Sequence, residues 1–265
     1  EMLRSLVGSE MCIRDRFCVS NGRLLDISSD IKNKKKSYTW SVNNPINNYN
    51  ISVQLGHYVS VQDTINRNGG TDTLNHYVLD YHEEVARNHF KQAKKVIRFF
   101  ETYFGDYQWW DDGYKLVEVS YLGMEHQSAV TYGNNWDNWR GTRSWTSKYY
   151  GIVDGLLFHE TAHEWWGNSV TAADPAHMWI HEGMAVYSEA MFIEEKYGFD
   201  EYNSFFKKNL LKKIPQYKPI VLNRNAIVTN HFHISKLTLE SLMPQASLHS
   251  PWINSGIPLG PHTYT

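Results

Sequence analysis

Residues 153–197 read VDGLLFHETAHEWWGNSVTAADPAHMWIHEGMAVYSEAMFIEEKY, and this stretch decides how the rest of the chain is interpreted. His159 and His163 are four residues apart, so on a helix both imidazoles lie on one face and can bind one metal ion. Zinc suits imidazole ligands and accepts tetrahedral geometry. Glu160, directly after the first histidine, is placed to contact a water molecule beside the metal. That is the position of a general base.

A catalytic zinc ion needs a third protein ligand and keeps one position open. Glu182 is the leading candidate, because turn signals at Gly167 and at residues 174–175 end a first helix and allow a second to begin near His177. Two antiparallel helices joined in this way bring the start of the second against the middle of the first. The sequence therefore predicts one zinc ion. The alternative is a pair of solvated histidines on an amphipathic helix.

The inner face of the second helix is expected to carry Ala185, Val186, Glu189 and Phe192, with Gly198 as its C-cap. Glu189 could orient a metal-bound imidazole from the second coordination shell, and an ordinary buried or solvated glutamate is the equal alternative. His181 points about 100° away from Glu182 on a helix, which favours packing or surface roles. His126 and His177 are further histidines without an assigned role.

Two motifs resemble those of the M1 family of zinc aminopeptidases, which are gluzincins. HETAHEWWGN followed by WIHEGMA is similar to the family's metal-binding pattern, with eighteen residues between His163 and the glutamate that resembles its third ligand. Upstream, Gly123-Met124-Glu125 is similar to the G-x-M-E-N motif, in which the glutamate holds the free amino terminus of the substrate. The resemblance implies that Glu125 is the amine anchor, with Gly123 and Met124 beside the substrate. His126 departs from the usual Asn, which affects details of the first subsite.

The resemblance covers roughly residues 37–220 and implies an α+β fold. We expect an antiparallel β segment, followed by a thermolysin-like and mostly helical zinc-peptidase domain with a small mixed sheet. Residues 1–18 are expected to be a non-native or disordered leader, 19–80 a partial N-terminal β domain, 81–222 the catalytic domain and 223–265 an irregular, frameshifted or truncated tail. Both cysteines, Cys12 and Cys18, fall in the leader, and two cysteines do not make a disulfide framework.

The periodicity of the sequence gives a coarse set of elements. Alternating residues predict strands at 38–42, 51–55 and 75–79, with turns at 43–45 and 69–70. A helical stripe predicts one helix over 83–104, ended by Gly105. Alternation over 114–121 predicts a strand, and the resemblance implies that its exposed edge would pair with an extended peptide. Residues 131–149 are expected to form a loop or lid, in which aromatic packing is the equal alternative. Residues 201–213 are expected to form a further helix.

Composition narrows the classes of partner. The 265 residues are 42% hydrophobic and carry a formal net charge of −2, so the chain can bury a core and shows no electrostatic footprint for nucleic acid. The basic clusters at residues 32–36 and 207–213 are interpreted as solvated faces. No stretch of eighteen apolar residues is present, so no transmembrane segment is predicted, and no secretory signal is visible. Compartment and oligomeric state stay open.

The expected function is removal of N-terminal residues from peptides that have a free N-terminus. Glu160 would act as the catalytic base, and His159, His163 and Glu182 would hold the zinc ion. The family also needs a tyrosine some sixty residues beyond the third ligand to stabilise the oxyanion, and no Tyr lies between Tyr217 and Tyr264. One alternative is therefore an impaired or non-catalytic zinc-binding fragment. A second is a gluzincin endopeptidase, which would have no use for Glu125.

Overall fold

The computed structural model of the chain describes residues 16–67, 69–134, 136, 153–174 and 177–207. The chain divides into two compact units. The first comprises Glu1–Ile97 with Tyr107–Thr161, and the second comprises Arg98–Asp106 with Ala162–Thr265. Across the described ranges, no helix combines the length and the apolar character that crossing a membrane requires. The α+β class predicted from the sequence is confirmed.

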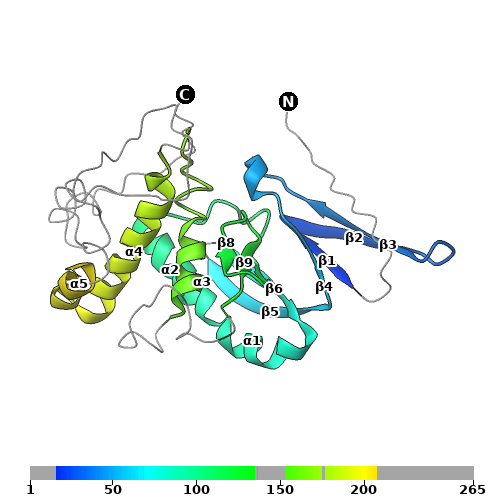
Figure 1. The fold of residues 1–265 in the computed structure, drawn as a ribbon, viewed down its shortest axis with the longest axis horizontal. Helices are drawn as coiled ribbons and strands as arrows, with labels where there is room; N and C mark the ends of the chain where they lie inside the picture. The colour runs from blue at the N-terminus through cyan, green and yellow to red at the C-terminus, as the bar shows by residue number, and fades with distance from the viewer. Residues whose placement is uncertain (1–15, 68, 135, 137–152, 175–176, 208–265) are drawn as a thin grey trace. The chain divides into compact units, whose positions relative to one another are not determined.

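Two antiparallel strand pairs open the first unit. Strand β1 (Phe17–Ser20) pairs with β4 (Val53–Gly56), and β2 (Arg23–Asp30) pairs with β3 (Lys35–Ser41) as the hairpin drawn in Figure 1. A single 3-10 turn, η1 (Asn48–Asn50), precedes β4. The buried aromatic rings of Tyr38 and Trp40 alternate along β3 and pack in one cluster with Val19 and Tyr77. This alternation is the period-two pattern expected at residues 38–42.

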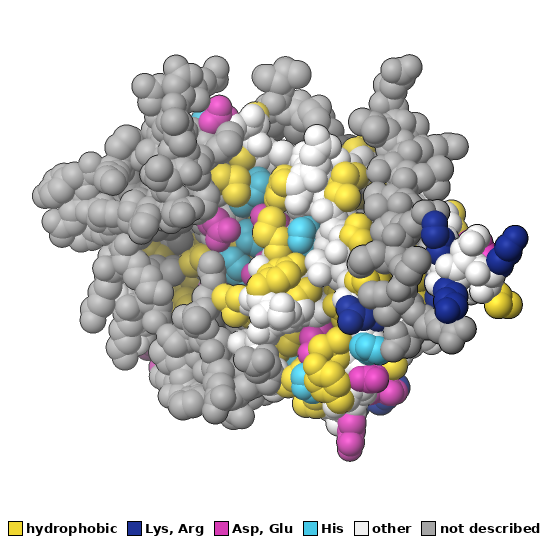
Figure 2. Space-filling view, turned by 45° about the vertical axis from the view of Figure 1, so that its right-hand side comes forward, with side chains coloured by type: hydrophobic (Ala, Val, Ile, Leu, Met, Phe, Trp, Pro, Cys, Tyr) yellow, Lys and Arg dark blue, Asp and Glu magenta, His cyan; other side chains and the backbone are white. Residues whose placement is uncertain are grey.

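The basic cluster at residues 32–36 lies at the closed end of this hairpin. Lys32 and Lys34 are exposed there, and Figure 2 shows Lys and Arg side chains gathered on one side of the described surface. Cys18, by contrast, is buried in the core of β1. Strand β1 therefore begins inside the segment 1–18 that the sequence set aside as a leader.

A five-stranded mixed sheet follows, in the order β5-β6-β7-β9-β8. Its members are β5 (Tyr58–Arg67), β6 (Gly70–Leu79), β7 (Leu116–Glu118), β8 (Gly123–Met124) and β9 (Val130–Tyr132). β5 and β6 form an antiparallel hairpin, β6–β7 and β7–β9 are parallel, and β8 pairs antiparallel with β9.

Two expectations differ from this sheet. A domain boundary near residue 80 does not separate the sheets, because β5 and β6 hydrogen-bond into the same sheet as β7 and β9. The strand predicted at 114–121 is also not at an edge, since β7 lies between β6 and β9. The edge strand is β8, which carries Gly123 and Met124.

The helical stripe predicted over 83–104 forms two helices, α1 (Glu83–His89) and α2 (Gln92–Phe104), after the 3-10 turn η2 (Asp80–His82). The break at Phe90 has no Gly or Pro signal in the sequence. Phe90 is 1% exposed, and its ring packs against the rings of His76, Tyr132 and Trp136. Tertiary packing of this one side chain therefore accompanies the interruption of an otherwise continuous apolar pattern.

In the second unit, α4 (Trp179–Tyr197) is followed by α5 (Phe199–Phe205). Gly198 separates them with a φ of 85°, a conformation that glycine adopts without steric cost, so the predicted C-cap is confirmed. Aromatic rings form the core of this unit. Phe99 meets Phe192 edge-on at 5.4 Å, and Phe100 stacks on Trp165 at 5.0 Å. The helix predicted at 201–213 starts earlier, at Phe199, and residues beyond 207 lie outside the described ranges, as does the tail.

Candidate metal centre

Helix α3 (Gly155–Ala162) carries the first half of the histidine motif. Leu156, Leu157 and Phe158 are buried, and the hydroxyl of Thr161 donates to the carbonyl oxygen of Leu157 at 2.6 Å. The helix ends at Ala162 and gives way to turns, rather than continuing to the region of Gly167 as expected. His163 follows the last helical residue, one turn beyond His159, and both histidines are 1% exposed.

The protonation of His163 is fixed by its neighbour. Nδ1 of His163 lies 2.9 Å from the carbonyl oxygen of Trp166, and a carbonyl can only accept a hydrogen bond. Nδ1 therefore carries a hydrogen, so in the neutral ring the lone pair is on Nε2. Nε2 is also the atom that lies 3.8 Å from Oε1 of Glu182, on the first turn of α4. A neutral imidazole held in one tautomer by a backbone carbonyl is the usual form of a metal-binding histidine.

The three predicted metal ligands are close together. His159, His163 and Glu182 each offer one ligand atom, and these atoms lie within 4.8 Å of one another. The division between the units falls inside α3, His163 directly follows the last residue of that helix, and Glu182 approaches His163 within the second unit. Two nitrogens and one carboxylate oxygen suit zinc. The side chain of Glu182 is 26% exposed, so the donor set is open to solvent, as a catalytic site requires.

The predicted base and the predicted amine anchor also approach this centre. Glu125, Glu160 and His163 offer ligand atoms that lie within 4.8 Å of one another. Glu125 is 6% exposed and Glu160 is 8% exposed. Two buried carboxylates at this spacing repel each other, so their charged forms favour a cationic group beside them.

The surroundings of Gly123 leave little room for a side chain at the start of the predicted anchor motif. A Cβ atom at this position would lie 3.0 Å from the carbonyl oxygen of Thr131 and 3.1 Å from Cγ and Oε1 of Glu160. These separations are tighter than ordinary van der Waals contacts. Glycine at position 123 therefore allows β8 to approach Glu160. Met124, the next residue of β8, is half-buried and lies opposite Thr131 of β9.

The turn after Glu125 is held by contacts that the sequence does not reveal. Ser128 has a φ of 60°, and its hydroxyl accepts a hydrogen bond from the backbone nitrogen of Gly22 at 2.9 Å. The buried ammonium of Lys115 donates to the carbonyl oxygens of Gly22 and Ser128 at 2.6 and 2.8 Å. Asn21 donates to the carbonyl oxygen of Gln127 at 2.6 Å. Asn21 and Gly22, which lie between β1 and β2, thus help to hold the loop that follows the predicted anchor Glu125.

His126, which replaces the usual Asn of the motif, belongs to the same loop. Its Nδ1 lies 3.1 Å from the carbonyl oxygen of Asn50. Burial lowers the pKa of His126 below its ordinary value, and the contacts with Asn50 and Glu125 oppose this effect. The neutral imidazole is therefore favoured, and as a hydrogen-bond donor it can take over the positioning role of an amide.

The remaining predicted residues take other places. His181 is 2% exposed and its Nε2 accepts from the backbone nitrogen of Ala172 at 2.9 Å, which is a packing role. Glu189 is buried on α4, and its role beside a metal-bound imidazole stays a prediction. His177 is half-buried before α4. In the loop or lid predicted at 131–149, the first two residues belong to β9 and Trp136 packs against other aromatic rings, whereas 135 and 137–149 lie outside the described residues.

Comparison with known sequences identifies one family and several relatives. Residues 88–233 match the family described as the peptidase family M1 domain. The chain is 45% identical over 47 residues to mouse "Aminopeptidase RNPEPL1", a match that covers 18% of this chain and 6% of that protein. It is 25% identical over 193 residues to "Probable aminopeptidase 2" of Sulfurisphaera tokodaii, covering 69% of this chain and 23% of that protein.

Solved structures show the same fold. The M1 zinc metallopeptidase of Deinococcus radiodurans superposes with a TM-score of 0.60 at 18% identity, covering 79% of this chain and 44% of that one. A mutant of that enzyme bound to a Tyr-Ser-Ala substrate gives a TM-score of 0.59 at 18% identity, covering 80% and 45%. The chain therefore corresponds to less than half the length of the proteins it matches.

Proposed function

Because the chain belongs to peptidase family M1, we propose that it carries the zinc-binding and peptide-binding part of an aminopeptidase that removes single N-terminal residues from peptides. The observation that supports this proposal best is the convergence of two groups of side chains. One group is the donor set of His159, His163 and Glu182, and the other is the carboxylate pair of Glu125 and Glu160. His163 belongs to both groupings, so the metal ligands and the two acids share one site.

His159, His163 and Glu182 would hold one zinc ion. When bound, zinc supplies Lewis acidity, which acidifies a water molecule and polarises a carbonyl group. Glu160 would have a different task, because its carboxylate lies close to that of Glu125. We assign it to accept a proton from the attacking water and to pass that proton to the leaving amine.

Glu125 would bind the protonated amino terminus of the peptide. Its carboxylate lies close enough to Glu160 that an ammonium group beside both would offset their repulsion. Anchoring the amino terminus there places the first peptide bond, and no internal bond, next to Glu160. This argument favours an aminopeptidase over an endopeptidase that shares the same metal ligands.

The edge strand β8 would align the peptide backbone. One side of β8 pairs with β9, and within the described part of the sheet no strand pairs with its other side. An extended peptide can add to such an edge through main-chain hydrogen bonds, which do not depend on the substrate's side chains. Gly123 and Met124 would therefore contact the first residues of any peptide substrate.

The main competing function is a zinc-binding chain with little turnover. This alternative rests on the absence of a Tyr between Tyr217 and Tyr264, where the family's oxyanion donor would be expected. Loss of such a donor costs about 3 kcal/mol of transition-state stabilisation. The chain could then bind metal and peptide and still hydrolyse slowly.

One set of measurements separates these functions. Zinc content is determined on the purified chain, and hydrolysis is followed with aminoacyl p-nitroanilides and with matched free and N-acetylated peptides. We expect one zinc per chain and cleavage of only the free peptides. Zinc without any turnover would support the non-catalytic alternative, whereas equal cleavage of acetylated peptides would indicate an endopeptidase.

A further inference from the structure

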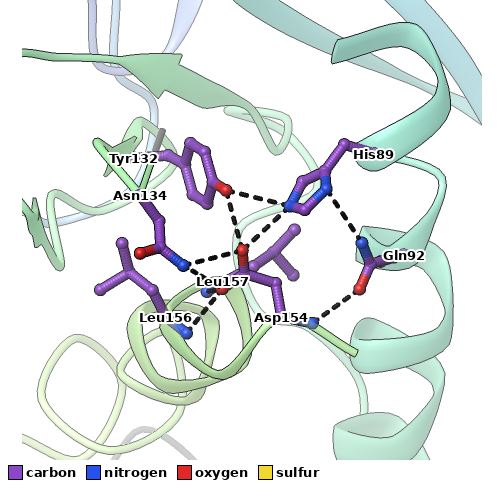
Figure 3. Close-up of polar contacts among 7 residues, drawn as sticks. All are labelled: His89, Gln92, Tyr132, Asn134, Asp154, Leu156 and Leu157. Carbon is purple, nitrogen blue, oxygen red and sulfur yellow. Dashed lines mark hydrogen bonds and ion pairs between the residues drawn. The ribbon is translucent and has the colours of Figure 1, made fainter. Parts of the chain in front are cut away.

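A second polar cluster lies in the first unit, away from the metal ligands. It is centred on Asp154, just before helix α3, and is drawn in Figure 3. The carboxylate of Asp154 is fully buried. Oδ1 accepts hydrogen bonds from the backbone nitrogens of Leu156 and Leu157 at 2.8 and 3.2 Å. Asp154 is therefore the N-cap of the helix that carries His159 and Glu160.

The same carboxylate is tied to other elements. Nε2 of His89, at the end of α1, lies 2.9 Å from Oδ2, and the hydroxyl of Tyr132 on β9 donates to Oδ2 at 2.8 Å. The amide of Asn134 donates to both oxygens at 3.2 and 3.1 Å. One side chain thus connects the first turn of α3 to α1 and to the end of β9 (Figure 3).

Gln92 links the backbone of Asp154 to the ring of His89. Its Oε1 accepts the backbone N–H of Asp154 at 2.6 Å, which fixes the orientation of the amide. Its Nε2 then faces Nδ1 of His89 at 3.4 Å and can only donate. Nδ1 of His89 is therefore an acceptor, and the ring hydrogen is on Nε2, directed at Asp154. His89, Tyr132 and Asn134 thus all direct hydrogens at one buried carboxylate.

The carboxylate of Asp154 lies near one of the predicted metal ligands along the chain. Asp154 precedes His159 by five residues, a rise of about 7.5 Å along a helix. Burial raises the pKa of Asp154, but the hydrogen bonds from His89, Tyr132 and Asn134 outweigh this effect. The pKa therefore lies below its ordinary value, and the carboxylate stays ionised. The positive end of the α3 dipole compensates the charge, and so would a cation held at His159.

We propose that Asp154 is a positioning residue for the metal site: its buried carboxylate fixes the first turn of α3 against α1 and β9, which orients His159 and Glu160, and its charge favours a cation at His159. This inference rests on the proposed function for the identity of the metal. The packing contacts themselves do not depend on catalysis. The assignment can therefore be tested without turnover.

The test compares Asp154→Asn with Asp112→Asn in the full chain. An Asn at position 154 keeps the N-cap, because Asn and Asp cap equally well, but its amide loses the charge and presents hydrogens to His89 and Tyr132. Asp112 is a matched control. It is equally buried in the same unit, and it accepts bonds from Asn43 and Asn44 rather than from α3.

Two properties are measured for each variant. The metal site is followed by zinc affinity, from chelator competition, and by the absorption spectrum of the Co²⁺ form. The helix is followed by amide hydrogen exchange of residues 155–162 without metal. For Asp154→Asn we expect at least about a tenfold loss of affinity, a changed Co²⁺ spectrum and about fivefold faster exchange. Asp112→Asn should match the parent in both. Parental values for Asp154→Asn, or equal losses in Asp112→Asn, would overturn the inference.

Two further outcomes are decisive. If Asp154→Asn does not fold, Tyr132→Phe removes one donor to Asp154, and an affinity unchanged from the parent would then refute the inference, against an expected loss of about threefold. If the parent binds no zinc, the proposed function fails. The role of Asp154 is then decided by the exchange of residues 155–162 alone.

Discussion

A Cβ atom on Gly123 would lie 3.1 Å from Oε1 of Glu160, so the strand that leads to the amine anchor approaches the residue assigned to move the proton. Both residues belong to the first unit, and their proximity does not depend on the second. The Gly123-Met124-Glu125 motif and the histidine motif are more than thirty residues apart in the sequence. They nevertheless lie side by side at Gly123 and Glu160.

Gly123→Ala tests this relationship. The added methyl group must displace Glu160 or β8 by a few tenths of an ångström, and small displacements of reacting groups reduce rates strongly. We expect kcat for an aminoacyl p-nitroanilide to fall about tenfold or more, with zinc content unchanged. Gly56→Ala is the control, since a Cβ there meets only side-chain atoms of Leu79 and Tyr58. A fully active Gly123→Ala variant would show that Glu160 tolerates the displacement.

Glu160→Gln separates the base from the metal ligands. The amide is nearly isosteric with the carboxylate but cannot accept a proton, so hydrolysis should fall by about 10²-fold or more. Zinc content, measured by atomic absorption, should remain at the parental level, because His159, His163 and Glu182 are intact. Loss of zinc in this variant would mean that Glu160 is a ligand and that the roles were wrongly assigned.

Glu125→Ala examines recognition of the amino terminus. Removing the carboxylate should raise KM and lower kcat for peptides with a free amine, while zinc binding is retained. The preference for free over N-acetylated peptides, taken as the ratio of kcat/KM values, should shrink by about tenfold or more, since charge-assisted contacts are stronger than neutral ones. An unchanged ratio would contradict the anchor role.

The stability of the first unit should depend on pH through His76. Burial lowers the pKa of His76 from 6.5 to about 3, and its Nδ1 accepts from the backbone nitrogen of Leu116 at 3.0 Å. Below pH 6.5 the unfolded chain binds a proton that the folded chain resists, so the free energy of unfolding decreases as pH falls from 6.5 toward 3. Between pH 7 and 5 the loss should be about 2 kcal/mol.

Urea unfolding at pH 7 and pH 5 measures this effect. His76→Gln keeps an acceptor for Leu116 and removes the titrating ring, so its stability should vary less between the two pH values than that of the parent. His57→Gln, at an exposed histidine, should behave like the parent. Equal pH dependence in all three proteins would assign the acid sensitivity to other groups.

The grouping of His159, His163 and Glu182 could be predicted from the sequence because its geometry is largely local. Four residues separate His159 from His163, so helical periodicity alone places both rings on one face. To bring Glu182 close to the two histidines, the chain must turn between two helices. The signals around Gly167 predicted such a turn. Each of these inferences uses only the spacing of residues along the chain.

Other features of the site and fold could not be predicted from the sequence, because they depend on contacts between distant segments. The carbonyl oxygen of Trp166 orients His163, and backbone atoms carry no sequence signal. Asp154 and His89 are 65 residues apart, so no periodicity links them. The break at Phe90 and the interior position of β7 likewise follow from packing and sheet order, not from propensity.

The brevity of strand β8 affects how long a bound chain would stay. Its two residues offer too few backbone groups to retain an extended segment unaided, which also limits unwanted association with other edges. How long a peptide stays bound to β8 would therefore depend on the contact between its amino terminus and Glu125. A polypeptide whose amino terminus is blocked or folded would dissociate before it reacts. Selection for free amino termini would then depend on how long each peptide stays bound as much as on the shape of the site.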